Sequence, residues 1–173
     1  AEWLSEKRGK AISELCVSVG RDSRVSGPRI VKAVANTLSS LGVSVKNCGL
    51  ASTPAMFMST LDLECDGAVQ ITASHHPWER NGLKFFTPDG GLEGSDISSL
   101  LERAETVDRD SFNPDCSKIA DVDYMSDYAA HLRDMIKKGV NAQNYDKPLE
   151  GFKIIVDAGN GVGGFYAENV LKP

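Results

Sequence analysis

The sequence predicts an α/β fold: a mixed, mostly parallel sheet flanked by helices, followed by the start of a second similar domain. From residue 15 onward, short apolar runs alternate with amphipathic stretches of helical period. Strands that alternate with helices tend to pair in parallel, because a crossover helix returns the chain to the same end of the sheet. Another apolar run, 153–157, follows a polar stretch that contains Pro148 and Gly151.

These breaks in composition predict three parts: a first domain at 1–140, a linker at 141–152 and the beginning of a second domain at 153–173. A chain of 173 residues can form a sizeable core, and chains of this length bury about 70% of their unfolded surface. The 41% hydrophobic and 25% charged content is ordinary for a globular protein.

The elements expected before residue 72 form a strand–helix–strand unit and a further helix and strand. In chain order they are a helix at 3–14, a strand at 15–19, a helix from Ser26 to Gly42, a strand at 43–48, a helix capped by Thr53, and a strand at 67–71. Ser26 is the expected N-cap of its helix because Pro28 falls in the first turn.

The remaining elements are expected to complete a sheet of about four strands in residues 1 to 140. They are a strand at 82–86, a turn at 87–91, a helix at 95–106, a loop at 107–121, a helix at 124–136, a strand at 153–157, and a helix that opens at 159–164 and runs to Val170.

The segment Thr72–Lys84 is the candidate site. It follows a predicted strand, and open α/β folds bind ligands at the carboxyl ends of their strands. The Ser74 hydroxyl is a candidate nucleophile that needs a neighbouring base or cation, and His75, His76 and Lys84 lie within the same segment. The alternative is an ordinary polar loop whose side chains bind backbone groups of the turn.

This segment resembles the active-serine loop of the α-D-phosphohexomutases, which reads close to T-A-S-H-N-P followed by N-G-x-K. Here the loop reads Thr72-Ala73-Ser74-His75-His76-Pro77 and then Asn81-Gly82-Leu83-Lys84, with His76 in place of the asparagine. Three other stretches, 19–28, 53–55 and 155–161, are similar to family motifs and occur in family order.

The resemblance implies that Ser74 is a phosphoserine in an enzyme that interconverts hexose 1-phosphates and 6-phosphates through a hexose bisphosphate. It implies that His75 and Lys84 surround this serine and that Lys84 supplies positive charge or proton transfer. Mg²⁺ would bind Ser74 through its phosphate, with its other ligands outside this chain, and hexose 1,6-bisphosphate would be the activator.

Substrate phosphate requires local positive charge, although the formal net charge is −5. We expect Arg21, Arg24 and Asn81 to contribute to phosphate binding, with two alternatives: Arg24 or Asp22 ties the loop to its neighbours through a salt bridge, and Asn81 acts as a turn former. Trp78 is expected to anchor the loop by packing. The acidic balance argues against a nucleic-acid surface.

The chain lacks the family's D-x-D-x-D-R metal loop and its Y-D-x-R-G segment. The resemblance therefore covers the first domain and the opening of the second, and it implies that the remaining domains of a longer chain are partners. We expect this piece to have little activity alone, and the sequence does not specify which hexose is the substrate.

A non-catalytic phosphosugar-binding module is the main alternative. Serine hydrolysis and dinucleotide binding are weakly supported, because no nucleophile elbow and no G-x-G-x-x-G motif occur.

The four cysteines are widely spaced and include no C-x-x-C pair. Cys16 and Cys48 lie in apolar runs, where buried free thiols are common, so a reducing compartment is expected. No apolar run approaches the roughly 18–20 residues of a membrane-spanning helix, and no membrane partner is expected. With no signal peptide visible, the predicted location is intracellular, in the cytoplasm or a plastid.

Overall fold

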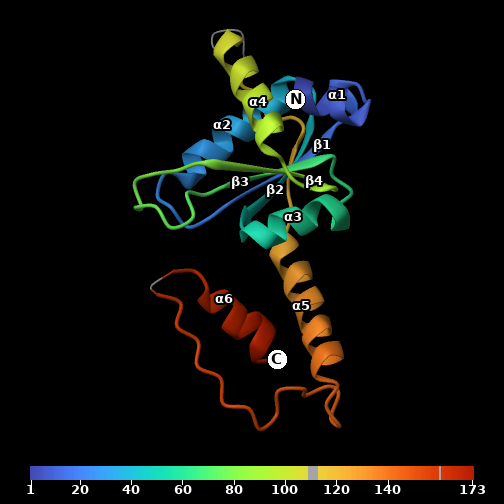
Figure 1. Ribbon diagram of the computed structural model, residues 1–173, viewed down its shortest axis with the longest axis vertical. Helices are drawn as coiled ribbons and strands as arrows, with labels where there is room; N and C mark the ends of the chain where they lie inside the picture. The colour runs from blue at the N-terminus through green and yellow to red at the C-terminus, as the bar shows by residue number, and fades with distance from the viewer. Residues whose placement is uncertain (109–112, 160) are drawn as a thin grey trace. The chain divides into compact units, whose positions relative to one another are not determined.

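The computed structural model describes residues 1–108, 113–159 and 161–173 (Figure 1). The chain divides into two compact units, Ala1–Val122 and Asp123–Pro173. The predicted domain boundaries, with a first domain at 1–140, a linker at 141–152 and a second domain from 153, remain predictions about the organisation of the chain.

The first unit contains a mixed sheet, as predicted, with the strand order β5-β4-β3-β1-β2-β6 among the described residues. The strands are β1 (Cys16–Arg21), β2 (Ser44–Leu50), β3 (Gly67–Ile71), β4 (Leu83–Thr87), β5 (Gly90–Gly91) and β6 (Ile119–Asp121). β1 lies parallel to β2 and β3, and β6 lies parallel to β2. β4 runs antiparallel to both β3 and β5.

Helices cover both faces of this sheet (Figure 1). One face is covered by α1 (Glu2–Arg8), α2 (Gly27–Ser40) and α4 (Gly94–Thr106), and the other by α3 (Thr53–Asp62). The two phenylalanines of β4 divide between the faces, because Phe86 packs against Phe57 of α3 while Phe85 borders the opposite core. This division fits the alternation of side chains along a strand.

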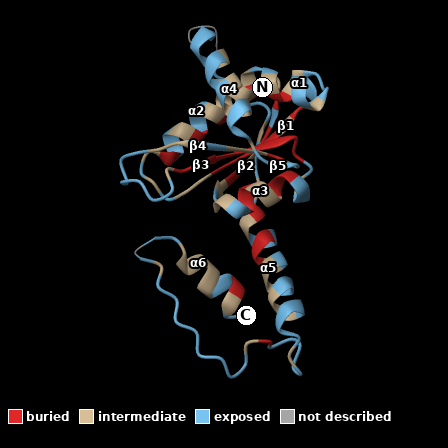
Figure 2. Ribbon diagram, in the orientation of Figure 1, coloured by how far each residue is buried: buried red, intermediate tan, exposed pale blue. Residues whose placement is uncertain are grey.

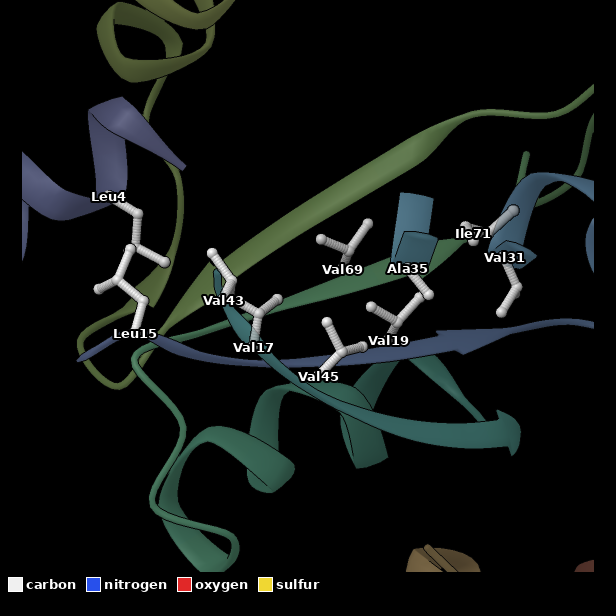
Figure 3. Close-up of a cluster of buried hydrophobic side chains, with 10 residues drawn as sticks. All are labelled: Leu4, Leu15, Val17, Val19, Val31, Ala35, Val43, Val45, Val69 and Ile71. Carbon is white, nitrogen blue, oxygen red and sulfur yellow. The ribbon is translucent and has the colours of Figure 1, made fainter. Parts of the chain in front are cut away.

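The core lies between the sheet and α2 (Figure 3). Its buried side chains are aliphatic and come from α1, β1, α2, β2, β3 and the residues just before β1 and β2: Leu4, Leu15, Val17, Val19, Val31, Ala35, Val43, Val45, Val69 and Ile71. All five residues of β3 are buried, and burial concentrates along the central strands (Figure 2). Such burial is typical of parallel strands that are covered on both faces.

Two helix boundaries expected for the first unit need correction. The helix expected at 3–14 stops at Arg8, because Gly9 adopts a left-handed φ of 62° and ends α1; a separate 3₁₀ turn, η1 (Ile12–Glu14), follows. The N-cap of α3 is Ser52 rather than Thr53, since the Ser52 hydroxyl accepts the Ala55 amide at 3.4 Å.

The loop expected at 107–121 contains a strand, and the part at 109–112 lies outside the described residues. β6 pairs Ile119 with Val45 of β2 at the sheet edge. A strand of three residues is too short to show alternation in the sequence. With β5, it raises the sheet from the expected four strands to six within the described part of the chain.

The second unit is built from α5 (Tyr124–Val140), α6 (Gly164–Tyr166) and the π-helical turn η3 (Ala167–Leu171). The strand expected at 153–157 is wrong, because these residues form no strand in the structure. Ile155 is 89% exposed. A strand requires a hydrogen-bonded neighbour, and the described part of this unit provides none.

No helix among the described residues is both long enough and apolar enough to cross a membrane.

Candidate active site

The segment between β3 and β4 forms a loop at the carboxyl end of β3 (Figure 1). The Thr72 amide donates to the Gly82 carbonyl at 3.0 Å and closes the base of this loop, which we call the serine loop (residues 72–82). The chain after β1 reaches the same edge of the sheet, because the Asp22 amide donates to the Ile71 carbonyl at 3.0 Å. Two segments that are fifty residues apart in the sequence therefore meet here.

Ser74 has a left-handed backbone, with a φ of 54°. Residues other than glycine adopt this backbone conformation at a cost of about 1–2 kcal/mol. Such a conformation persists when the surrounding contacts determine it, and it is concentrated at functional sites. The side chain is exposed, and no hydrogen bond of its hydroxyl is recorded among the described residues.

A short chain of hydrogen bonds holds the backbone of Ser74. Its amide donates to the Thr72 hydroxyl at 3.0 Å, and that hydroxyl donates to Asp22 Oδ2 at 2.7 Å. On the other side, Arg24 Nη2 donates to the Ser74 carbonyl at 2.9 Å. Both backbone groups of Ser74 are thereby fixed while its hydroxyl stays available to a ligand.

Arg24 joins this network through a salt bridge with Asp22. Arg24 Nε lies 2.9 Å from Asp22 Oδ2, and the Arg24 amide donates to Asp22 Oδ1 at 3.0 Å. Arg24 Nη1 donates to the carbonyls of Pro77 at 2.5 Å and Arg80 at 3.0 Å. These contacts match the alternative in which the arginine ties the loop to its neighbours. Phosphate binding by Arg24 stays a prediction.

Asn81 also connects the serine loop to Ser26, the residue before α2. Its Nδ2 donates to the Ser26 hydroxyl at 2.9 Å, and its Oδ1 accepts the Gly82 amide at 3.1 Å. Ser26 precedes α2 as expected, but its side chain makes no capping bond to the helix amides. Arg21 is half-buried and donates to the Asp22 carbonyl at 3.0 Å. Phosphate binding by Arg21 and Asn81 stays a prediction.

His75, His76 and Lys84 are all exposed. The two imidazole rings stack, with centroids 4.9 Å apart and planes at 23°. Lys84 lies opposite Gln70 in the β3–β4 pairing, and Gln70 precedes Ser74 by four residues in the sequence. Among the described residues, no hydrogen bond joins Ser74 to His75 or to Lys84, so their predicted catalytic roles are untested.

Trp78 does not anchor the loop by packing as expected, because its side chain is 70% exposed. The loop is anchored by Asp22, which was named from the sequence only as a possible salt-bridge partner, and by Thr72, which lies in the candidate segment but was given no role of its own. The sequence feature that could have indicated this role is the i, i+2 spacing of Asp22 with Arg24 and of Thr72 with Ser74. At this spacing a short polar side chain can bind a backbone amide.

The described residues include no group of three His, Cys, Asp or Glu side chains that could hold a metal ion. The donors in this part of the chain therefore do not form a metal site by themselves. Binding of Mg²⁺ through a phosphate on Ser74 stays a prediction.

The fold and the loop together define an α/β/α domain that presents a serine at the carboxyl end of a central strand. Residues 1–110 match the family model described as phosphoglucomutase/phosphomannomutase, alpha/beta/alpha domain I. The chain belongs to the phosphoglucomutase/phosphomannomutase family. This finding confirms the resemblance noted from the serine loop.

Individual relatives agree with this assignment. The chain is 33% identical to a phosphomannomutase/phosphoglucomutase of Pseudomonas aeruginosa, over 99% of this chain and 35% of that protein. It is 32% identical to a phosphoglucosamine mutase of Nautilia profundicola, over 92% of this chain and 34% of that protein. The chain thus spans about a third of the length of these curated relatives.

A solved structure shares the fold. The crystal structure of a phosphoglucomutase/phosphomannomutase family protein from Burkholderia thailandensis aligns with a TM-score of 0.61 and 26% identity. The alignment covers 76% of this chain and 30% of that chain.

Proposed function

We propose that this chain supplies the phosphoryl-transfer serine of a longer phosphohexomutase, which interconverts hexose 1-phosphate and hexose 6-phosphate. The observation that carries the proposal is the exposed Ser74, held at a φ of 54° by hydrogen bonds to both of its backbone groups. The relatives named for glucose, mannose and glucosamine phosphates support a hexose phosphate as the class of substrate.

In the proposed reaction, phosphoserine 74 donates its phosphoryl group to a free hydroxyl of a hexose monophosphate. The bond between phosphorus and Oγ breaks, a bond to the sugar oxygen forms, and the proton of that hydroxyl passes to a base. The hexose bisphosphate then reorients, and Ser74 Oγ bonds to the phosphorus at the other position. The bond from that phosphorus to its sugar oxygen breaks, and the oxygen receives the proton held by the base. The serine ends phosphorylated again and the hexose phosphate is isomerised.

Phosphoryl transfer depends mainly on positioning and on offsetting negative charge. The fixed backbone of Ser74 would supply the positioning, since neither of its peptide groups is free to rotate without breaking a hydrogen bond. His75, Lys84 and Arg21 are the candidates for the positive charge, and Lys84 or His75 is the candidate base. Each is a role that we propose for the assembled active site.

The proposal includes magnesium, and other segments of the longer protein would complete its coordination. When bound, it would offset the charge of the phosphoryl group. The part that this chain can offer is the phosphate carried by Ser74, because the described residues hold no cluster of metal ligands.

The test is the mass of the peptide that carries Ser74, taken from the full-length protein after exposure to hexose 1,6-bisphosphate and magnesium. We expect a phosphoryl adduct on Ser74 that is lost when hexose monophosphate is added, and no adduct in the Ser74→Ala protein. Absence of an adduct in folded wild-type protein would contradict the mutase mechanism and favour a non-catalytic phosphosugar-binding module.

We further propose that residues 1–173 alone turn over little hexose phosphate, because their relatives are about three times as long. Substantial mutase activity of the isolated segment in a coupled assay would contradict this. The intracellular location, cytoplasmic or plastid, remains part of the same proposal.

A further inference from the structure

Two cysteines meet at the amino ends of β1 and β3. Cys16 is the first residue of β1, and Cys65 lies in the turn between α3 and β3. Their Sγ atoms are 3.5 Å apart, and both thiols are free. Cys65 is 2% exposed, whereas Cys16 is half-buried.

The backbone holds these two residues together. The Asp66 amide donates to the Cys16 carbonyl at 2.8 Å, and the Cys16 amide donates to Asp66 Oδ2 at 3.0 Å. Lys46 Nζ donates to the Leu63 carbonyl at 2.6 Å and fixes the turn that carries Cys65. A disulfide bond is about 2.05 Å long, so the sulfurs need to approach by roughly 1.5 Å to form one.

The charges around the pair make the two thiols unequal. The hydrogen bond from Cys65, assisted by the ammonium groups of Lys46 and Lys10, lowers the pKa of Cys16, although burial and the Asp66 carboxylate oppose this. The same hydrogen bond, together with burial, raises the pKa of Cys65. Thiolates are the nucleophiles in disulfide exchange, so Cys16 is the attacking thiol and Cys65 the resolving one.

We propose that Cys16 and Cys65 form a thiol–disulfide switch that responds to small-molecule disulfides such as oxidised glutathione. Cys16 attacks one sulfur of oxidised glutathione, forms a mixed disulfide and releases one glutathione thiolate. Cys65 then attacks Sγ of Cys16, its proton passes to the departing second glutathione, and the protein disulfide forms. Two protein thiols are oxidised while one glutathione disulfide is reduced to two thiols.

This switch is independent of the proposed mutase chemistry. The pair lies at the amino ends of β1 and β3, whereas Ser74 follows the carboxyl end of β3. The bond would close the segment from 16 to 65, which contains β1, α2, β2 and α3. Closing a long loop restricts the unfolded chain, so oxidation should raise the thermal midpoint without changing the phosphorylation of Ser74.

In the experiment, the native full-length protein is incubated in mixtures of reduced and oxidised glutathione. The exchange is quenched with acid, the remaining free thiols are blocked, and the peptides are identified by mass. We expect a peptide pair linked through Cys16 and Cys65 that dithiothreitol separates, with Cys48 recovered as a free thiol. Free Cys16 and Cys65 in oxidised glutathione without reductant, or a bond from either to a different cysteine, would overturn the proposal.

Matched variants separate the two steps. In Cys65→Ser, Cys16 should keep glutathione as a lasting mixed disulfide, because the resolving thiol is gone. In Cys16→Ala, the buried Cys65 should take up no glutathione, and its modification there would overturn the order of attack. Cys48→Ser should form the Cys16–Cys65 bond at the wild-type rate, and loss of the bond in this control would also overturn the assignment.

Discussion

A carboxylate lies at each end of the β1–β3 pair, and the two carboxylates have different roles. At the carboxyl ends, Asp22 is 26% exposed and binds Arg24 and Thr72, which in turn hold Ser74. At the amino ends, Asp66 is 3% exposed and binds Lys10, Arg8 and the Cys16 amide. One carboxylate positions an exposed serine, and the other joins α1, the following turn and the first strand.

This difference indicates where function and stability are separable. The Asp22 network adjoins solvent and supports a strained residue, so its loss should disturb the serine more than the fold. Asp66 is nearly enclosed and satisfies a buried amide, and its loss should disturb the fold more than the serine. The predictions below test this separation, from the largest expected effect to the smallest.

Ser74 itself gives the largest effect. Ser74→Ala and Ser74→Gly should both abolish the phosphoryl adduct, because the accepting oxygen is gone. Glycine carries no penalty at a φ of 54°, so the glycine protein should be more stable than the alanine protein by about 1 kcal/mol. Urea denaturation of the two variants measures this difference, and equal midpoints would argue against backbone strain at Ser74.

The Thr72 hydroxyl comes next. Thr72→Val removes the group that accepts the Ser74 amide and donates to Asp22, and we expect the rate of Ser74 phosphorylation to fall about tenfold or more, since small losses of position are costly in group transfer. Thr72→Ser keeps the hydroxyl and is the matched control. Similar rates in the valine and serine proteins would exclude the positioning role.

Asp66→Asn should lower the free energy of unfolding by about 2 kcal/mol, because a charged hydrogen-bond partner is lost. Burial disfavours the Asp66 charge, but hydrogen bonds from Lys10 and the Cys16 amide prevail and hold the pKa of the carboxyl below its ordinary value. Urea denaturation at pH 7 measures the change. A loss of unfolding free energy as small as that from neutralising an exposed carboxylate would contradict the prediction.

The same lowered pKa sets a pH dependence. Since the unfolded chain holds this proton more tightly, the contribution of Asp66 is complete above about pH 4 and is lost as the pH falls through the folded-state pKa. The difference in stability between wild type and Asp66→Asn should therefore shrink below about pH 4. A difference that grew on acidification would reverse the sign and contradict the assignment.

The smallest effect is expected on the surface. Arg103 forms two hydrogen bonds with the Glu6 carboxylate, at 3.0 and 2.6 Å, and both groups face solvent. Exposed ion pairs contribute little. Arg103→Gln should leave the urea midpoint unchanged within error, and a clear shift would mean that α1 and α4 depend on this pair.

The sequence predicted the sheet well where strands are long and covered. β1 and β3 are largely apolar runs, β2 alternates apolar and polar residues, and the parallel pairing of β1 with β2 followed from the intervening helix. It failed for β6, which is three residues long, and for 153–157, where an apolar run has no partner strand among the described residues. Periodicity indicates what could pair, not whether a partner is present.

The serine loop could be located from its motif, and a salt bridge of Arg24 or Asp22 that ties it to its neighbours was one expected alternative, but the hydrogen bond from Thr72 to Asp22 could not be predicted. Asp22 and Thr72 act through contacts that join residues fifty positions apart. The cysteine pair was missed for the same reason, because Cys16 and Cys65 become neighbours only when β1 and β3 align. Contacts across parallel strands leave little trace in local spacing.

The most direct test compares Asp22→Asn with Asp66→Asn in the full-length protein, measuring both the rate of Ser74 phosphorylation by hexose bisphosphate and the free energy of unfolding. We predict that Asp22→Asn loses most of the phosphorylation rate at a stability cost of about 1 kcal/mol, while Asp66→Asn loses about 2 kcal/mol and keeps its rate in the folded fraction. Equal losses of rate in the two proteins would contradict the assignment of Asp22 to the serine and Asp66 to the fold.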